Sequence, residues 1–177
     1  MKKTAAQIRA EDDPGKEFFS RFGVHFCLVS KQAAPNFLPV VLYRPACVVL
    51  FVSSEMKAEA ESLAKAIARA APGTRIETIG VENAWDIEKC RDLVADALAR
   101  HEDEKPIVNV TGGTKIMAFA ALTTAFELEM PSFYLNENDN TISVLSPRRM
   151  GEADRIPPIA ISVSIKNYLA AYGYEVL

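Results

Sequence analysis

One stretch of the sequence, residues 106–121, constrains the fold more than any other. Its first five residues, 106–110 (PIVNV), are apolar and rich in β-branched side chains, a composition that predicts a short buried strand. From Lys115 to about Leu128 the residues favour helix. The four residues between them, 111–114 (TGGT), must therefore turn the chain directly from a strand into a helix.

The chemistry of this turn predicts a small anion-binding site. Gly112 and Gly113 permit positive φ angles and let another molecule approach the backbone closely. Thr114 stands where a side chain caps a helix, so the first free N–H groups of the helix point out of the turn. Lys115 adds a full positive charge beside them. A Gly-Gly turn can also be only a tight connection, but the threonines on both sides and the lysine that follows favour anion binding.

Short apolar runs alternate with helical segments along the chain. We expect strands at residues 24–30, 47–52, 74–79, 106–110, 132–135 and 141–145, and helices at residues 37–43, 56–69, 84–99, 115–128 and 162–171. Residues 136–140 (NENDN) predict a hairpin turn between the last two strands. Strand–helix units of about 25 to 30 residues predict a parallel sheet covered on both faces. The expected fold is a doubly wound, Rossmann-like α/β domain with a mainly parallel sheet of about six strands.

Three segments are expected along the chain. Residues 1–22 form an N-terminal extension whose apolar cluster, Phe18, Phe19 and Phe22, packs onto the domain. Residues 23–147 form the domain itself, and residues 148–177 form a linker and a short C-terminal helix. In doubly wound sheets, ligands bind outside the carboxyl ends of the strands. The loops expected at that edge are residues 30–36, 53–56, 80–83 and 111–115.

Composition excludes several classes of protein. A net charge of −3 argues against a general nucleic-acid binder, so a phosphate ligand has to be held by local geometry. No apolar run reaches about 18 residues and the N-terminus lacks a hydrophobic signal core, which favours a cytoplasmic protein without a membrane partner. Cys27 and Cys47 lie in apolar runs and are expected to be reduced core residues.

The sequence lacks the common catalytic and cofactor motifs. The glycine turn is not a Walker A loop, and no G-x-G-x-x-G follows the first strand. His25 and His101 lie too far from cysteine or acidic clusters to predict a metal site, so we expect structural roles for both. We therefore expect no metal, no cofactor and no catalytic residue. Trp85, Met117 and Phe119 are most simply packing residues, with a dimer contact as the alternative for the last two.

Three blocks of sequence resemble the CARF domain of type III CRISPR ancillary proteins, and in particular the branch in which this sensor precedes a restriction-like nuclease domain. The blocks are LVSKQAAPNFLP (residues 28–39), SSEMK (residues 53–57) and NVTGGTKIM (residues 109–117). The resemblance covers about residues 24–146, and YLAAYGY (residues 168–174) is similar to the segment that leads into the effector domain. The TGGTK block alone is moderately specific, whereas three blocks in order are much more so.

The resemblance implies a homodimer that binds cyclic oligoadenylate, with the ring-shaped RNA lying across the groove between two copies. The resemblance implies Ser30 and Gln32 as contacts from the first loop, with Asn36 as a further candidate, and Thr111, Gly112, Gly113, Thr114 and Lys115 as the phosphate- and ribose-binding set of the glycine turn. Lys31 in the first loop and Ser53 and Ser54 in the second complete the predicted ligand-binding residues. Ser53 and Ser54 are equally well explained as a helix cap. A ring of phosphates suits a symmetric cleft to which each copy presents its own turn.

The resemblance leaves two functions open. The first is a sensor, most simply of cyclic tetra-adenylate, that regulates an effector domain absent from this chain. The second is a stand-alone, metal-independent ring nuclease in which a ribose 2′-hydroxyl attacks the neighbouring phosphate. No residue stands out as a general base, which favours the sensor. A DNA-binding regulator would need a basic recognition helix, and none is seen, so we expect no double-stranded DNA as a partner.

The chain departs from the resembled proteins in two respects. An extension of about 22 residues precedes the first strand, and no nuclease domain follows Leu177. The first leaves open what the extension packs against, and the second removes the usual output of the sensor. We therefore expect a fused or associated effector domain in the parent protein.

Overall fold

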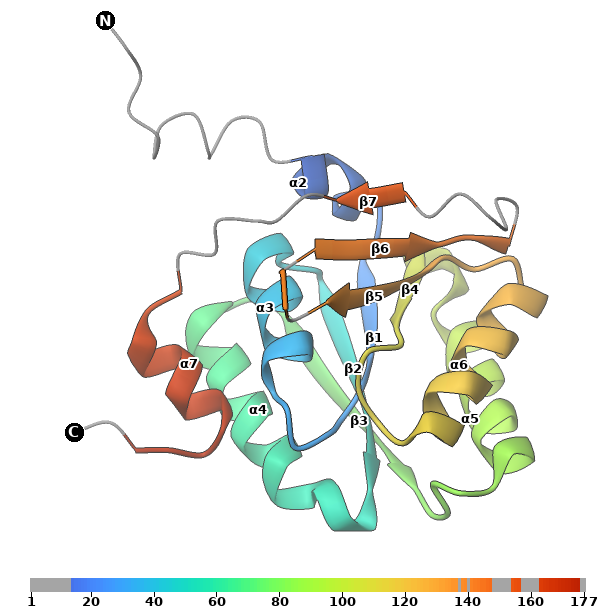
Figure 1. Cartoon of the computed structure of the whole chain (residues 1–177), viewed down its shortest axis with the longest axis horizontal. Coiled ribbons are helices and arrows are strands. Elements are labelled where there is room, and N and C mark those ends of the chain that lie inside the picture. The colour runs from blue at the N-terminus through green and yellow to red at the C-terminus, as the bar shows by residue number, and fades with distance from the viewer. Residues whose placement is uncertain (1–13, 137, 140, 148–153, 157–162, 176–177) are drawn as a thin grey trace, which may run out of the picture.

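Seven strands form one sheet in the computed structural model, which describes residues 14–136, 138–139, 141–147, 154–156 and 163–175. The strands are β1 (Val24–Leu28), β2 (Cys47–Ser53), β3 (Arg75–Val81), β4 (Pro106–Asn109), β5 (Ser132–Asn136), β6 (Thr141–Leu145) and β7 (Asp154–Ile156). Their order in the sheet is β3-β2-β1-β4-β5-β6-β7 (Figure 1). The first five run parallel, and β6 and β7 are each antiparallel to the preceding strand.

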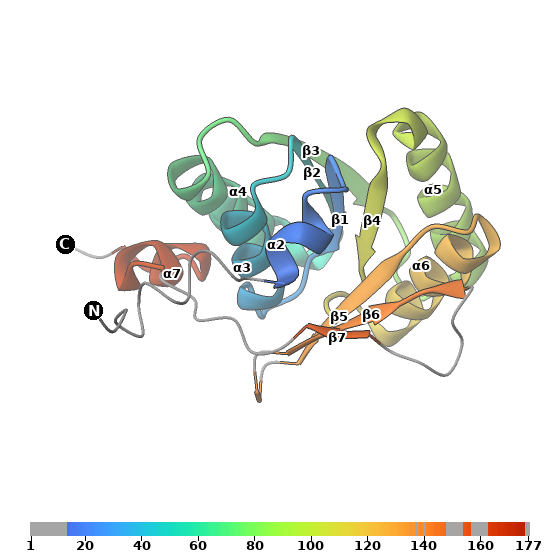
Figure 2. The same ribbon diagram turned by 90° about the horizontal axis from the view of Figure 1, so that it is seen from above.

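Helices cover both faces of this sheet. Within the described residues they are α2 (Pro14–Phe19), α3 (Ala34–Tyr43), α4 (Lys57–Ala70), α5 (Ile87–Arg100), α6 (Lys115–Glu127) and α7 (Ile165–Ala171), with 3-10 turns at Ser54–Met56 and Glu102–Glu104. The helices α3 and α4 lie on one face with α7 against α4, and α5 and α6 lie on the other (Figures 1 and 2). This arrangement confirms the predicted doubly wound fold, and it explains why β1 is buried at every position.

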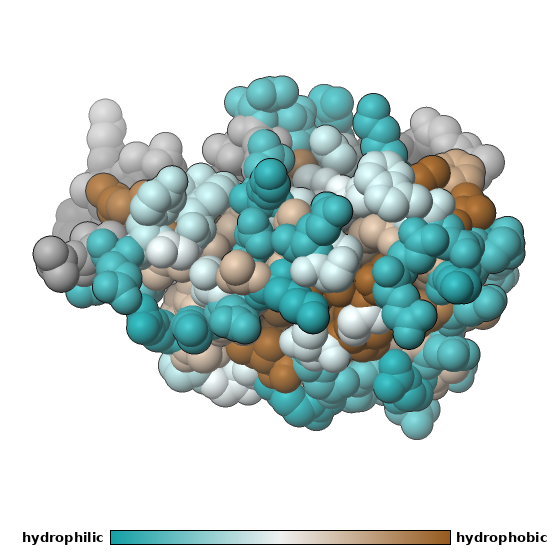
Figure 3. Space-filling view, turned by 90° about the horizontal axis from the view of Figure 1, so that it is seen from below, coloured by the Kyte–Doolittle hydropathy of each residue, from teal (hydrophilic) through white to brown (hydrophobic). Residues whose placement is uncertain are grey.

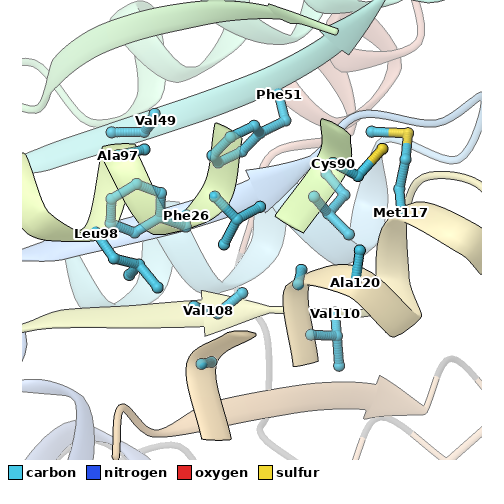
Figure 4. Packing of buried hydrophobic residues seen from close by; sticks show 14 of the residues in the cluster. Phe26, Val49, Phe51, Cys90, Ala97, Leu98, Val108, Val110, Met117 and Ala120 are labelled. Atoms are coloured by element: carbon cyan, nitrogen blue, oxygen red, sulfur yellow. The ribbon is translucent and has the colours of Figure 1, made fainter. Parts of the chain in front are cut away.

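The core beneath α5 and α6 shows how the apolar pattern selects the buried helix face. Phe26 of β1 and Phe51 of β2 have ring centroids 5.8 Å apart, and Ala97 and Leu98 of α5 lie over them (Figure 4). Removing a side chain such as phenylalanine from water contributes about 1.5–3 kcal/mol. Because the apolar residues of α5 recur at helical spacing, one face of the helix covers these rings while the other stays in water.

The phenylalanine cluster of the N-terminal extension packs onto the domain, as the sequence predicted. Phe19 is buried, stacks on Tyr43 with centroids 4.1 Å apart, and meets the edge of Phe133 at 5.1 Å. Phe18 and Phe22 pack against the same buried cluster. The three cysteines are also buried and free, which confirms the core role expected for Cys27 and Cys47. The helix α2 is thus anchored to the domain by aromatic packing.

The seventh strand was not predicted. β7 lies in the segment expected to be a linker and pairs with β6, so the sheet has seven strands rather than about six. The rest of that segment (residues 148–153 and 157–162) and residues 1–13 of the extension lie outside the described residues. No helix in the described part of the chain has the length and apolar composition needed to cross a bilayer.

Three helices, α3, α5 and α7, begin three residues from their predicted start, and the first two have a local reason. α3 begins at Ala34 because Pro35 lies in the first turn of the helix, where its missing N–H has no partner to lose. α5 begins at Ile87 because the Asp86 carboxylate accepts a hydrogen bond from the Lys89 N–H at 3.2 Å and caps the helix there. The remaining boundaries agree with the sequence prediction to within about three residues.

Candidate functional site

The strand order brings two predicted loops together. β1 and β4 are neighbours in the sheet, and the chain leaves them in opposite directions, to β2 after β1 and to β5 after β4. The loop after β1 (residues 29–33) and the glycine turn after β4 (residues 111–114) therefore lie side by side at the carboxyl edge, the lower edge in Figure 1. In doubly wound sheets this reversal of strand order is where ligands bind.

Two buried asparagine side chains hold these loops together. Asn36 of α3 donates from Nδ2 to the Leu28 carbonyl at 2.8 Å. Asn109, the last residue of β4, donates from Nδ2 to the Pro35 carbonyl at 2.8 Å and to Asn36 Oδ1 at 3.0 Å. Asn36 is 1% exposed and Asn109 is 0% exposed, so water does not compete for these bonds. The two loops therefore keep one relative position.

Thr111 connects these amides to the next strand. Its backbone N–H donates to Asn109 Oδ1 at 3.1 Å, and its hydroxyl donates to the same oxygen at 2.7 Å. Thr111 Oγ1 also accepts from the Leu135 N–H of β5 at 2.8 Å. We call Asn36, Asn109 and Thr111 the amide relay. The relay fastens the start of the glycine turn to both neighbouring strands.

Thr114 fastens the other end of the turn. Its Oγ1 accepts from the Met117 N–H at 3.1 Å, which confirms the predicted helix cap. The same hydroxyl donates to the Ala84 carbonyl at 2.8 Å. Ala84 belongs to the loop between β3 and α5, so a third loop of the carboxyl edge contacts the glycine turn. The first residues of α6 are thereby held in a defined direction.

The structure explains why positions 112 and 113 are both glycine, for a reason that the sequence did not reveal. A Cβ at Gly112 would collide with the Leu28 carbonyl oxygen, so the close approach that requires glycine at this position comes from β1. Gly113 has φ +75°, a left-handed conformation that favours glycine, and a Cβ there would meet the Leu28 side chain at 3.0 Å. Both glycines are therefore required for the turn to pack against the end of β1.

The predicted site residues differ in their access to solvent. Lys31, Gln32, Ser54 and Lys115 are exposed, Ser30, Ser53, Thr111, Gly113 and Thr114 are half-buried, and Asn36 and Gly112 are buried. Ser30 donates from its hydroxyl to the Gln32 carbonyl at 3.2 Å, which shapes the loop after β1. Ser53 precedes the 3-10 turn but makes no capping hydrogen bond with its side chain. Asn36 supports the loops from below.

The site combines hydrogen-bond donors with the exposed ammonium groups of Lys31 and Lys115. Beneath it, burial raises the pKa of the Cys27 thiol to about 12, although a hydrogen bond with Asn109 lowers it, so Cys27 is a neutral thiol at physiological pH. Within the described ranges, no three His, Cys, Asp or Glu side chains are placed to hold a metal ion. Such an arrangement can bind an anion through oriented N–H groups and charge.

An apolar hollow lies next to Lys115. It has a volume of about 520 Å³ and is lined by Val110, Lys115, Ala118, Phe119, Leu122, Tyr134, Ser143 and Leu145. Phe119 is 57% exposed and Tyr134 is 46% exposed, whereas Met117 on the inner face of α6 is 3% exposed. The packing role expected for Met117 is therefore confirmed, and that expected for Phe119 is wrong. No charged residue occurs between Lys115 and Glu127, so α6 is apolar on its outer face as well.

Sequence reasoning missed two residues at this edge. Asn109 is a polar residue at the end of an apolar strand, and a buried amide must find partners, so its position was a usable signal. Trp85 was expected to pack, but it is 71% exposed in the loop after β3. No local pattern in the sequence distinguishes a covered loop tryptophan from an exposed one. Figure 3 shows the face formed by these loops, where hydrophilic side chains surround smaller apolar patches.

A protein-family model described as the Card1 CARF domain matches residues 24–168. The matched range includes the loop after β1 (residues 29–33) and the glycine turn after β4 (residues 111–114), which we call together the β1–β4 junction. It also includes the amide relay and the outer face of α6. No curated protein was matched by its sequence.

Solved structures share the fold. Can2 from Sulfobacillus thermosulfidooxidans in complex with cyclic tetra-adenylate is 28% identical with a TM-score of 0.76, over 91% of this chain and 44% of that one. A type III CRISPR defence DNA nuclease activated by cyclic oligoadenylate is 22% identical with a TM-score of 0.68, over 88% of this chain and 24% of that one. Csm6 from Enterococcus italicus, bound to cyclic hexa-2′-fluoro-hexa-dAMP, is 18% identical with a TM-score of 0.57, over 65% of this chain and 33% of that one. This chain thus spans less than half the length of each.

Proposed function

Because this chain belongs to the Card1 CARF domain family, we propose that it is a sensor of cyclic oligoadenylate in type III CRISPR signalling. The observation that carries the proposal is the β1–β4 junction, where the glycine turn and the loop after β1 lie side by side with Lys115 exposed next to them. Each charge-assisted bond from such a site to a phosphate is worth about 1.5–3 kcal/mol. A few of these bonds hold a polyanion despite the net negative charge of the chain.

The proposed ligand is cyclic tetra-adenylate. The support is the likeness to Can2, whose complex contains that ring and whose sequence is 28% identical over most of this chain. In this proposal the N–H groups of the glycine turn and Lys115 bind phosphates, and Ser30, Lys31 and Gln32 contact the ring from the loop after β1. Asn36 acts from beneath by fixing the loops, since its amide is buried and already hydrogen bonded.

The proposed binding unit is a homodimer that uses the outer face of α6. Soluble monomers rarely expose a large contiguous apolar surface. The outer face of α6 has such a surface, with Phe119, Leu122 and Tyr134 around a hollow. Lys115 lines the same hollow, so a second copy seated on it brings two lysines and two glycine turns toward one axis. A ring with repeated phosphates is bound well by such a symmetric pair.

The proposed output is the regulation of an effector domain in the parent protein. The chain spans 44% of Can2 and 24% of the DNA nuclease, so those relatives contain further sequence beyond the shared domain. The helix α7 packs along α4, whose first turn follows Ser53 and Ser54 at the ligand edge. Because the two helices are packed together, a shift of α4 on ligand binding moves the C-terminal helix α7 as well.

Calorimetric titration with cyclic tri-, tetra- and hexa-adenylate tests the ligand. We expect the tetra-adenylate to bind most tightly, with one ring for every two chains. Replacing Lys115 with alanine should lower the affinity at least about tenfold with folding intact, because one charge-assisted bond per copy is lost. Lys166→Ala, an exposed helical lysine in α7, is the matched control and should leave the affinity unchanged.

Unchanged binding by Lys115→Ala would contradict the proposed site, and no binding of any ring would contradict the sensor itself. The same samples, incubated with cyclic tetra-adenylate and a chelator, distinguish the alternative function. Rapid formation of linear product would replace the sensor with a metal-independent ring nuclease.

The dimer is tested by replacing Phe119 with glutamate. A charge in the apolar hollow should convert a dimer, measured by light scattering, into a monomer of 19.4 kDa, and should weaken ring binding because each monomer holds half a site. Ile165→Glu changes an equally apolar residue that is 77% exposed in α7 and should remain dimeric. A wild-type chain that is monomeric with and without ligand would exclude the proposed dimer.

A further inference from the structure

Trp85, the only tryptophan of the chain, is held out into solvent by an ordered loop. On one side of it, Ala84 is buried in the core beneath α5 and α6. On the other side, Asp86 caps α5. The Trp85 backbone N–H donates to Asn83 Oδ1 at 3.0 Å, so the loop has its own internal bond. The exposure of the indole ring is therefore imposed by its anchored neighbours and does not come from a loose segment.

The loop that carries Trp85 contacts the glycine turn directly. The Ala84 carbonyl accepts from Thr114 Oγ1 at 2.8 Å, and Thr114 is the cap of α6. Trp85 is thus one residue away from a hydrogen bond to the turn that we propose binds phosphate. The loops after β1, β3 and β4 all leave the sheet at its carboxyl edge, so the loop that carries the exposed Trp85 borders the proposed site.

An exposed indole at this rim suits one component of the proposed ligand. Tryptophan is highly buried on average in soluble proteins, so 71% exposure leaves a large flat apolar surface in water. Nucleobases stack on such aromatic faces in proteins that bind single-stranded nucleic acid, and purines offer the larger face. The phosphates of a cyclic oligoadenylate have donors in the glycine turn, whereas its adenines need apolar surface beside them.

We infer that Trp85 stacks on an adenine of the bound ring and contributes to its affinity. The inference rests on the proposed function, because it concerns the base-binding part of the same site. In this arrangement Thr114 links the two halves of the site, since one hydroxyl holds both the phosphate-binding turn and the loop that presents the indole ring.

The single tryptophan makes the test direct. Tryptophan fluorescence, excited at a wavelength that the five tyrosines of the chain do not absorb, reports only on Trp85. Stacking of adenine should quench it in proportion to the ring bound in a parallel calorimetric titration with cyclic tetra-adenylate. Trp85→Ala should lower the affinity about five- to a hundredfold. Trp85→Phe should retain most of the binding, and Trp85→Leu should not, because leucine is apolar but cannot stack.

Tyr174→Ala is the matched control, since Tyr174 is 65% exposed but lies beyond α7. It should bind the ring as the wild type does. Thermal unfolding of each variant checks that the fold is retained, as expected for the removal of an exposed side chain.

The outcomes separate this inference from the proposed function. If the wild type binds the ring while the fluorescence stays unchanged and Trp85→Ala binds equally well, the role of Trp85 is refuted and the sensor stands. If Trp85→Ala loses affinity only because it no longer dimerises, the indole ring is an interface contact and stacking is refuted. If the wild type binds no ring by calorimetry, both proposals fail together.

Discussion

The two ends of the sheet treat buried polar groups in opposite ways. At the carboxyl end, the buried amides of Asn36 and Asn109 are each hydrogen bonded at 2.8 to 3.0 Å, to each other and to the backbone. Near the amino end of β1, His25 is 0% exposed among Phe19 and Phe133, and within the described residues neither of its ring nitrogens has a hydrogen-bond partner. At the carboxyl end, hydrogen bonds between buried polar groups fix the relative position of two loops. At the amino end, a buried polar ring only fills space among aromatic side chains.

Charge is also distributed differently between the two ends. At the amino end, Arg75 approaches Glu77 at 3.0 Å and Glu104 at 3.3 Å, and His101 meets the same two carboxylates at 3.3 and 2.8 Å. The hydrogen bond from His101 is the main reason that the pKa of Glu104 is lowered. These carboxylates are more than one-third exposed, so salt screens the cluster. The relay at the carboxyl end contains no charged group and its two amides are buried, so salt does not screen its hydrogen bonds.

The largest effect that we expect is at the amide relay. Asn109→Ala leaves the Pro35 carbonyl, Asn36 Oδ1 and both donors of Thr111 without the partner that now serves them. Each buried group left unsatisfied costs about 1–3 kcal/mol, so the free energy of unfolding should fall by at least about 3 kcal/mol. Urea denaturation at neutral pH measures the difference.

Asn138→Ala, an exposed asparagine in the turn before β6, is the control and should stay close to the wild type. Asn109→Asp sharpens the test because it keeps the oxygen that Thr111 uses but removes the two bonds donated by Nδ2. A loss of less than about 1 kcal/mol in Asn109→Ala would mean that the relay adds little to stability, and the contrast between the two ends would disappear.

A smaller, pH-dependent effect is expected at His25. Burial lowers its pKa to about 3, below the value of 6.5 of an exposed histidine. Between these two values the unfolded chain binds a proton that the folded chain does not, so this contribution to stability is complete above pH 6.5 and is lost as the pH falls toward 3. From about pH 7 to about pH 5 the loss should be about 2 kcal/mol.

His25→Leu should remove this loss while keeping the ring-sized volume filled with apolar atoms. The measurement compares urea denaturation of the variant and the wild type at the two pH values, and His101, present in both, cancels in the difference. An identical pH dependence in both chains would show that His25 does not titrate as a buried neutral ring. The amino end would then resemble the carboxyl end in satisfying its polar groups.

Sequence reasoning was most accurate where a signal acts over a few residues. Thr114 was predicted to cap α6, and its hydroxyl does so, because a cap needs only the next turn of helix. The hairpin between β5 and β6 was likewise predicted from its turn residues and is observed. The glycine pair was located correctly, but its closest neighbour is the Leu28 carbonyl, which no local pattern indicates. The ligand contacts of the predicted site residues stay predictions.

By itself, the sequence determined which segments become the first six strands and the helices between them, in what order, and where the glycine turn lies, whereas it did not indicate the short edge strand β7. These properties follow from hydrophobic periodicity, caps and turn residues, all of which act between near neighbours. Only the tertiary structure decided that β1 lies beside β4, that Asn109 bonds across to α3, and that Trp85 and Phe119 face solvent. Those facts depend on which distant segments pack together, and a local pattern carries no information about its distant partner.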